Sequence, residues 1–160
     1  MGSLSIGDDT ILFDDEDAEI VLSRTWRIQR NKRHKYSATG EQTLLHRFLM
    51  GCHSGDGILI DHINGNTLDN RRSNLRRATR GQNNSNSIKC RGTSRFKGVY
   101  WYKRHAKWHA QIKCDSRRFH LGYFSIEEDA ARAYDETARR LYGEFACLNY
   151  PREGERSALI

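Results

Sequence analysis

The chain has 160 residues, of which 37% are hydrophobic, a formal net charge of +7 and a mean hydropathy of −0.82. This length suits one domain or two small ones. The sequence contains no long uncharged apolar run, and its first 20 residues lack the basic and then apolar layout of a secretory signal. We therefore expect a small intracellular protein rather than a membrane protein or a large multi-domain enzyme.

Charge is distributed unevenly along the chain. Residues 1–20 carry seven acidic and no basic side chains, residues 21–120 have a net charge of +17, and residues 121–160 have a net charge of −3. The central hundred residues therefore suit a polyanionic partner such as a nucleic acid. The four cysteines are 24 to 38 positions apart and form no C-x-x-C pair, so we expect reduced thiols and no structural zinc site.

The first 50 residues form a preface with apolar positions of its own. Residues 14–19 are strongly acidic. Because carboxylates favour the positive end of a helix dipole, this run predicts the solvent-exposed start of a helix.

A strand, a long turn, a second strand and a helix are predicted in the middle of the chain. The apolar run 58–60 leads toward an Asn-Gly turn signal. Residues 75–78 suit a short second strand. Thr79 and Gln82 have the spacing of a capping box, which predicts a helix that begins at Thr79.

Three short strands are predicted beyond residues 87–94, a stretch with the composition of a basic linker. Apolar and polar side chains alternate with a period of two over 99–102, 107–113 and 118–121. One face of these strands is apolar, and the other carries cations, imidazoles and aromatic hydroxyls.

A helix is predicted to cover the apolar face of these strands. Ser125 and Glu128 have capping-box spacing at its start, and Gly143 is a natural stop at its end. The polar face of the strands is then left open to solvent or to a partner.

The middle of the chain resembles the HNH nuclease family, in the phage and intron-encoded branch whose third motif letter is asparagine. The resemblance covers about residues 45–86 and rests on Asp61-His62, on Asn74 twelve positions after the histidine and on Asn83 nine positions further. It implies two strands and a helix around a single metal. By resemblance, His62 is the general base, Asn74 holds the loop and orients His62, and Asp61 and Asn83 are the metal ligands. His46, in Leu-His-Arg, supports the site.

Phosphodiester hydrolysis needs these residue types. Negative charge builds on the phosphate and on the leaving 3′ oxygen, which a divalent cation stabilises, and a neutral imidazole accepts the proton of the attacking water. The oxygen ligands of one Asp and one Asn favour Mg²⁺ or Mn²⁺ over Zn²⁺. Neighbouring residues of a strand point to opposite faces, so Asp61 and His62 can flank one phosphate only if the strand bends or ends there.

Residues 95–151 resemble the AP2/ERF-type DNA-binding domain, through the segments 96–99, 107–112, 121–124, 128–135 and 148–151. The resemblance implies a three-stranded antiparallel sheet that lies in the DNA major groove and packs on one helix. Tyrosines stand where most relatives have two arginines, and a histidine where they have a tryptophan, which argues against a guanine-rich target. The matching contact positions are Lys97, Tyr100, Tyr102, Lys113, Arg118 and His120.

Two further groups of cations suit contacts with the DNA backbone. The first is predicted to surround the active site, and the second either follows flanking duplex or is a solvated hairpin. The first group is Arg71, Arg72, Arg76, Arg77 and Arg80, and the second is Arg24, Arg27, Arg30, Lys32, Arg33 and Lys35.

The sequence thus predicts an α+β protein that is a metal-dependent DNA endonuclease of the homing or phage type, acting on double-stranded DNA in the host cytoplasm. The expected parts are residues 1–86 with the ββα-metal nuclease module, the linker 87–94, the AP2-like domain 95–151 and a tail at 152–160. We infer no membrane and no obligate protein partner. A DNA-binding regulator with a degenerate nuclease module and an RNA-binding module are the alternatives. The recognition sequence, the choice between nicking and double-strand cleavage, and the role of residues 1–50 stay open.

Overall fold

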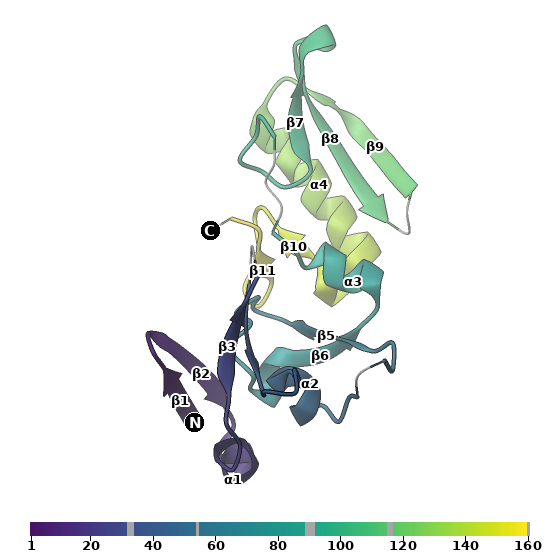
Figure 1. Ribbon diagram of the computed structural model, residues 1–160. Coiled ribbons are helices and arrows are strands. Elements are labelled where there is room, and N and C mark those ends of the chain that lie inside the picture. Colours follow the sequence, from purple (N-terminus) through teal and green to yellow (C-terminus); the bar gives the residue numbers. More distant parts are fainter. Residues whose placement is uncertain (32–33, 54, 89–91, 115–116, 160) are drawn as a thin grey trace. The chain divides into compact units, whose positions relative to one another are not determined.

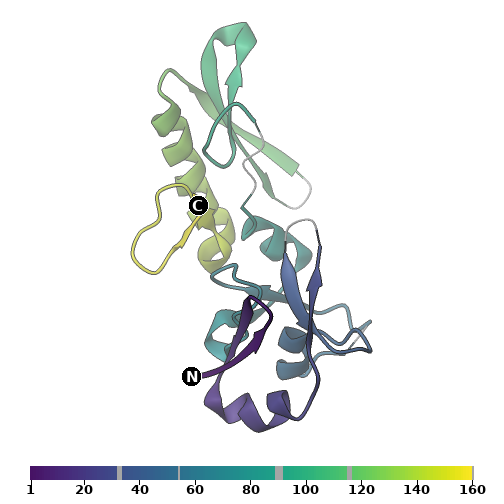
Figure 2. The same ribbon diagram turned by 60° about the vertical axis from the view of Figure 1, so that its left-hand side comes forward.

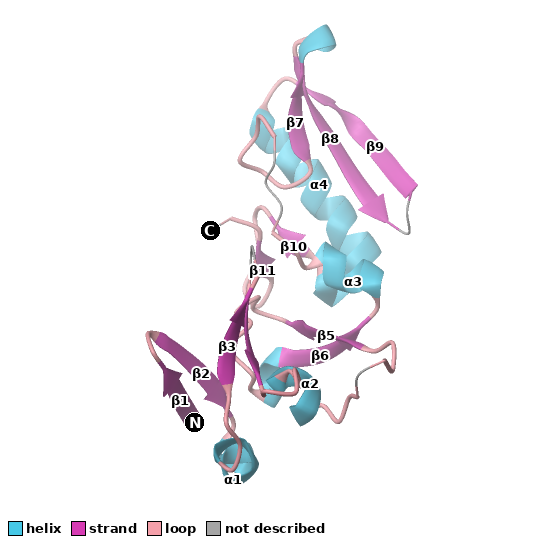
Figure 3. Cartoon of the chain, viewed as in Figure 1, coloured by secondary structure: helices cyan, strands magenta, loops and turns pink. Residues whose placement is uncertain are grey.

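The computed structural model describes residues 1–31, 34–53, 55–88, 92–114 and 117–159 (Figure 1). They form two compact units, Met1–Thr79 and Arg80–Ile160, each treated separately below. Short helices alternate with small sheets, most of them antiparallel (Figure 3), in agreement with the predicted α+β class. Within the described ranges, no helix has the length and apolar character that crossing a membrane requires.

The described residues of the first unit form three two-stranded antiparallel sheets and two short α-helices. The predicted strand at 58–60 and the strand at 75–78 are both present and pair with each other. The elements in chain order are β1 (Gly2–Ile6), β2 (Asp9–Phe13), α1 (Ala18–Leu22), β3 (Arg27–Arg30), β4 (Lys35–Ala38), α2 (Leu45–Leu49), β5 (Leu59–His62) and β6 (Leu75–Ala78).

The core of the first unit joins the N-terminal preface to the predicted nuclease segment. Strand β2 contributes the fully buried Ile11 and Phe13, and Leu68 from the loop between β5 and β6 packs in the same cluster. The other members come from α1, from α2 and from the residue just before β3. The preface therefore completes the core of the unit that contains His62. The buried members are Ile11, Phe13, Val21, Trp26, Leu45, Leu49 and Leu68.

The acidic run at 14–19 is less exposed than predicted. It forms a 3-10 helix (Asp15–Asp17) followed by α1, and Asp17 is only 5% exposed. Its carboxylate accepts hydrogen bonds from Nε and Nη2 of Arg72 at 3.0 and 2.6 Å. The prediction of a fully solvated helix start is wrong for Asp17, because a cation distant in sequence neutralises it.

The second unit contains a three-stranded sheet covered on one side by a long helix (Figure 2). Ala110 of the central strand packs with Ala130 and Ala131 of the helix, and these small side chains permit a close approach. The predicted strands are present, as is the helix after Thr79. The elements are α3 (Arg80–Ser85), β7 (Val99–Tyr102), β8 (Lys107–Cys114), β9 (Arg117–Phe124), α4 (Glu127–Tyr142), β10 (Cys147–Leu148) and β11 (Arg156–Ser157).

Two boundaries of the second unit differ from the sequence-based expectation. Helix α4 is preceded by Ile126, which makes no side-chain cap, so the predicted cap at Ser125 is wrong. The stop at Gly143 is confirmed, where φ is 54°, a conformation that glycine adopts without strain.

The predicted tail is part of the fold. Strand β11 pairs in parallel with β10, and the neighbouring Ala158 is buried. The compact units divide at Thr79 rather than after residue 86, and residues 89–91 of the predicted linker lie outside the described residues. Cys52, Cys114 and Cys147 form no disulfide in the described part of the chain; Cys90 lies outside it.

Candidate functional site

His62 lies at the end of β5, within a cluster of three rings. Its side chain is 5% exposed and meets the His46 ring edge-on, with 4.9 Å between the centroids. Tyr36 of β4 lies 5.5 Å from the His46 ring and 6.4 Å from the His62 ring. Strands β4 and β5 and helix α2 thus each contribute one ring to the cluster.

Burial lowers the pKa of both imidazoles in the cluster. Burial, then the charge of His62 and of Arg47, lowers the pKa of His46 to about 3. Burial also lowers the pKa of His62 below its usual value, while the Asn70 side chain and the Asp61 carboxylate oppose this shift. At neutral pH His62 is therefore unprotonated, the state in which a ring nitrogen can take a proton.

Asp61 is as buried as His62 and is held by Arg76, its partner on β6. Nε and Nη2 of Arg76 lie 3.0 and 2.9 Å from the same oxygen, Oδ2. The Asp61 charge also raises the pKa of Tyr36, after the larger effect of burial. Tyr36 therefore interacts with the charge of Asp61 and with the ring of His62. Strand β5 ends at His62, where the N–H of Gly65 donates to the His62 carbonyl at 2.9 Å.

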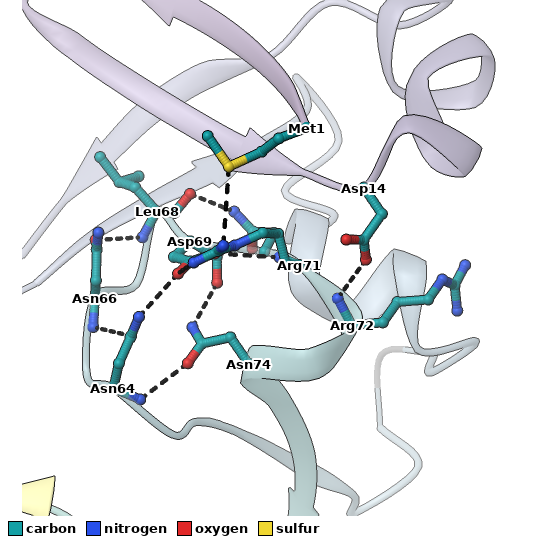
Figure 4. Close-up of polar contacts among 10 residues, drawn as sticks. Met1, Asp14, Asn64, Asn66, Leu68, Asp69, Arg71, Arg72 and Asn74 are labelled. Atoms are coloured by element: carbon teal, nitrogen blue, oxygen red, sulfur yellow. Dashed lines mark hydrogen bonds and ion pairs between the residues drawn. The ribbon is translucent and has the colours of Figure 1, made fainter. Parts of the chain in front are cut away.

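Asn74 closes the loop that joins β5 to β6 (Figure 4). Its Oδ1 accepts the N–H of Asn64 at 2.9 Å, and its Nδ2 donates to the Asp69 carbonyl at 2.8 Å. The Asn64 side chain in turn donates to the Asp69 carboxylate at 2.8 Å. The backbone carbonyl of Asn74 accepts the N–H of Ile63 at 2.9 Å. These bonds suit the loop-holding role predicted for Asn74.

Several predicted DNA-binding arginines are engaged in ion pairs that shape this loop. Arg71 donates to both carboxylate oxygens of Asp69, at 2.7 and 2.6 Å. The N–H of Arg72 donates to the Asp14 carboxylate at 2.7 Å (Figure 4), and its guanidinium binds Asp17. Arg76 pairs with Asp61, whereas Arg77 and Arg80 are exposed.

The second predicted group of cations is also partly neutralised. Arg30 and Lys35 donate to the two carboxylate oxygens of Asp9 at 2.7 and 2.6 Å. Arg24 lies over the Phe48 ring, 4.5 Å from its centroid. Lys32 and Arg33 lie outside the described residues.

The predicted metal ligands fall in different units. Asp61 belongs to the first unit, whereas Asn83 is exposed on α3 in the second, and the positions of the two units relative to one another are not determined. Among the described residues, no three His, Cys, Asp or Glu side chains are grouped to hold an ion. Since the predicted pair includes only one residue of these types, this finding does not test it.

The polar face of the three-stranded sheet carries rings and cations, and we call it the outward face. Nε2 of His109 and Nδ1 of His120 lie 2.5 Å apart, with the rings stacked. Lys113 and Arg118 are exposed and lie directly opposite each other. The members of the outward face are Tyr100, Tyr102, His109, Lys113, Arg118, His120 and Tyr123, which share ring contacts or strand register.

Two predicted contact residues are less accessible than the others. Lys97 is 8% exposed, and its Nζ donates to the Ser85 carbonyl at 2.5 Å. Its backbone N–H donates to Asn149 at 2.7 Å. The structure thus places Lys97 inside the unit and not on the outward face. The hydroxyl oxygen of Tyr100 is also buried and has no hydrogen-bond partner within the described ranges.

Sequence reasoning missed three residues of these sites. Tyr36 reaches the His62 ring from a strand that no motif connects to it. The side chain of Asn70, in the loop between β5 and β6, raises the pKa of His62. His109 pairs with His120; the alternation of polar residues in β8 placed it on the polar face, but the contact positions taken from the AP2 resemblance did not include it.

Two family models match the chain, "HNH endonuclease" over residues 44–85 and "AP2 domain" over residues 94–144. Protein 3.8 of Escherichia phage T7 is 33% identical over 91 residues, which are 56% of this chain and 74% of that protein. An uncharacterized HNH endonuclease of Acanthamoeba polyphaga mimivirus is 36% identical over 92 residues, or 58% of this chain and 47% of that protein.

The AP2 region is also similar to plant proteins. Dehydration-responsive element-binding protein 2E of Oryza sativa subsp. japonica is 41% identical over 75 residues, which are 46% of this chain and 22% of that protein. The chain therefore spans most of the length of the phage relative, less than half of the mimivirus relative and about a fifth of the plant relative.

Proposed function

Because the chain belongs to the HNH endonuclease family and carries an AP2 domain, we propose that it is a metal-dependent DNA endonuclease whose AP2 sheet holds the target duplex. The observation that carries the proposal is the buried, neutral His62 at the end of β5, next to the carboxylate of Asp61. This arrangement supplies a proton acceptor and an oxygen ligand at neighbouring positions of one strand.

In the proposed reaction, His62 accepts a proton from the water that attacks the phosphorus. The new bond joins the water oxygen to phosphorus, the bond to the 3′ oxygen breaks, and that oxygen takes a proton from solvent. The rings of His46 and Tyr36 restrict the motion of the His62 ring. Because His46 has a pKa of about 3, it remains neutral and does not repel the protonated His62 that forms.

Asp61 and Asn83 are the residues that would hold a divalent ion, and their oxygen donors fit Mg²⁺ or Mn²⁺. Such an ion supplies stabilisation of the charge that builds on the phosphate and the leaving oxygen. Arg76 pairs with Asp61, and both of its contacts go to Oδ2. A carboxylate has two oxygens, so the ion pair and metal coordination are compatible.

The outward face of the sheet is the proposed surface for double-stranded DNA. Lys113 and Arg118 lie opposite each other, and like charges so placed are unfavourable unless an anion lies between or beside them. A DNA phosphate fits this requirement. Tyr102, His120 and His109 would contact base edges or sugars, with no arginine pair to favour guanine.

The relative in phage T7 supports a phage or homing context, in which the protein acts on DNA in the host cytoplasm. One observation favours the alternative, a DNA-binding regulator with an inactive nuclease module. The ion pair with Arg76 already balances the charge of the Asp61 carboxylate, which weakens the attraction of its second oxygen for a metal ion. Binding of DNA without cleavage is the behaviour that this alternative predicts.

A nicking assay on supercoiled plasmid distinguishes the two functions. The full chain is incubated with plasmid and Mg²⁺ or Mn²⁺, with EDTA as the metal-free control, and DNA binding is measured in parallel. We expect relaxed or linear DNA only when the metal is present. Tight binding with no cleavage in either metal would instead support the regulator.

A further inference from the structure

We propose that Gln111 determines the base sequence that the AP2 sheet binds, and that it recognises an adenine within the bound site. The inference rests on the proposed function, because the outward face must hold the target duplex for Gln111 to reach a base. It assigns base recognition to a residue outside the predicted contact set, and it names A·T as the base pair that this residue selects.

Gln111 lies near the middle of the outward face. It belongs to the central strand β8, between His109 and Lys113, and pairs with His120 on β9. The next residue of the strand, Ile112, is 2% exposed and packs against α4. Because successive side chains of a strand point to opposite faces, the Gln111 side chain lies on the side of the sheet away from α4.

The residue beside Gln111 on the β7 side is Gly98. The Gln111 N–H donates to the Gly98 carbonyl at 2.9 Å, and Gly98 has no side chain that could cover the Gln111 amide. Gln111 is only half-buried. A base edge in a DNA groove can therefore approach the amide.

The side-chain amide of Gln111 makes no hydrogen bond to any residue that the structure describes. An amide carries N–H donors on one side and a carbonyl acceptor on the other. A partner that presents one acceptor and one donor side by side would bind both halves of this group at once.

A β-bulge in β9 aligns two rings with Gln111 and its neighbour. The register of β9 against β8 shifts just before Gln111, so that Tyr123 pairs with His109 and His120 pairs with Gln111. Without this shift Leu121 would lie opposite Gln111. Bulges often re-aim side chains next to functional sites. Here the bulge brings the rings of Tyr123 and His120 together on the outward face, 4.7 Å apart.

Cations lie at both ends of the part of β8 that carries Gln111. Lys107 is exposed at one end, and Lys113 is exposed at the other, opposite Arg118. Six residues of a strand span about 20 Å, which is the length of about six base pairs. Phosphate contacts position a protein on DNA, whereas contacts to base edges carry sequence information. Phosphates bound at the two ends would place Gln111 over the bases between them.

The chemistry of the amide selects adenine among the four bases of the major groove. Adenine presents the acceptor N7 beside the donor N6, which match the Nε2 and Oε1 atoms of a glutamine. Guanine presents two acceptors, and cytosine and thymine present one polar group each, so these bases leave part of the amide without a partner. The methyl group of the thymine paired with adenine suits an apolar ring contact, and Tyr123, 38% exposed, supplies such a ring.

Selection from a randomised duplex library tests the proposal without cleavage. The full chain is incubated with the library in EDTA at one fixed salt concentration, and the bound duplexes are sequenced. The chains compared are the original, Gln111→Ala, Gln111→Glu and the control Gln29→Glu. Gln29 is exposed on β3 of the first unit, so this control repeats the change of charge outside the AP2 sheet. Thermal unfolding measures whether each variant is folded.

We expect the original chain and Gln29→Glu to select the same site, with an A·T pair at the position that the Gln111 variants change. Gln111→Glu should prefer C·G there, since a carboxylate accepts from N4 of cytosine. Gln111→Ala should accept all four base pairs. For two duplexes that differ only by A·T and G·C at this position, fluorescence anisotropy gives the ratio of affinities. Gln111→Ala should reduce that ratio by about 5- to 150-fold.

The same selected sequence for the original chain and the folded Gln111 variants would overturn the role of Gln111. If Gln111→Ala does not fold, Gln111→Glu decides alone, because it keeps the size of the side chain. A change at a G·C pair of the original site would overturn the recognition of adenine. In these cases the chain still binds a defined duplex, so the proposed function stands. Binding without any selected sequence would overturn this inference alone, whereas failure to bind duplex DNA would overturn the proposed function with it.

Discussion

Two nitrogens of Arg76 converge on one carboxylate oxygen of Asp61, with Nε and Nη2 lying 3.0 and 2.9 Å from Oδ2. The two residues lie opposite each other on β5 and β6, and both side chains are largely buried. The ion pair therefore links the two strands of the sheet and holds the carboxylate of the proposed metal ligand.

Removal of either partner of this pair should be strongly destabilising. We expect Arg76→Met to lower the free energy of unfolding by about 3–5 kcal/mol, because it leaves a buried carboxylate without a counter-charge. Urea denaturation measures the change, and the double variant Asp61→Asn with Arg76→Met should recover part of the loss. A change below about 1 kcal/mol would show that the pair is solvated in solution.

The buried His46 should make the first unit sensitive to acid. Its pKa is about 3 in the folded chain, against an ordinary value of 6.5, so the unfolded chain binds more protons below pH 6.5. The free energy of unfolding is therefore highest above pH 6.5. It decreases as pH falls, by about 2 kcal/mol between pH 6.5 and 5. Denaturation at several pH values should show a shallower decrease for His46→Gln. Equal slopes would contradict a neutral, buried His46.

Arg118 and Lys97 should respond differently when DNA binding is titrated with salt. Arg118 is exposed on the outward face, whereas Lys97 is buried and bonded to the Ser85 carbonyl. We expect Arg118→Ala to weaken binding and to reduce the slope of log K against log salt by about one. Lys97→Met should leave the slope unchanged. A loss of slope in Lys97→Met but not in Arg118→Ala would place the DNA on another surface.

The imidazole pair on the outward face should couple DNA binding to proton uptake. Burial and the charge of His120 lower the pKa of His109 below 6.5 in the free chain. A nearby phosphate favours the protonated ring, so the pKa rises on binding and affinity increases as pH falls through about 6.5. DNA titrations from pH 8 to 5.5 should show this gain, and His120→Gln should reduce it. The same pH dependence in both would exclude the pair from the interface.

The sequence predicted correctly those strands and helices whose pattern lies within one short segment of the chain. Alternation in residues 107–113 and the apolar run before Asp61 indicated strands that the structure contains. The role of the preface was not accessible in this way, because Leu12 and Asn70 meet through backbone bonds that carry no residue preference.

Local sequence patterns also did not predict which polar side chains are buried. Lys97 was predicted on the DNA side from its place in the AP2 motif, but Asn149 and Ser85, distant in sequence, draw it inward. Tyr36 joins the His62 ring cluster across 26 positions. Asp17 is neutralised by Arg72 from the loop before β6. Each of these contacts depends on tertiary packing of segments that no spacing rule connects.

The most direct test of the central claim is the single-turnover cleavage rate of His62→Gln, measured with Mg²⁺ beside the original chain and with DNA affinity determined for both. Loss of a general base predicts a decrease of at least about 100-fold in rate with affinity unchanged. Cleavage by His62→Gln at the rate of the original chain would contradict the assignment of His62 as the proton acceptor.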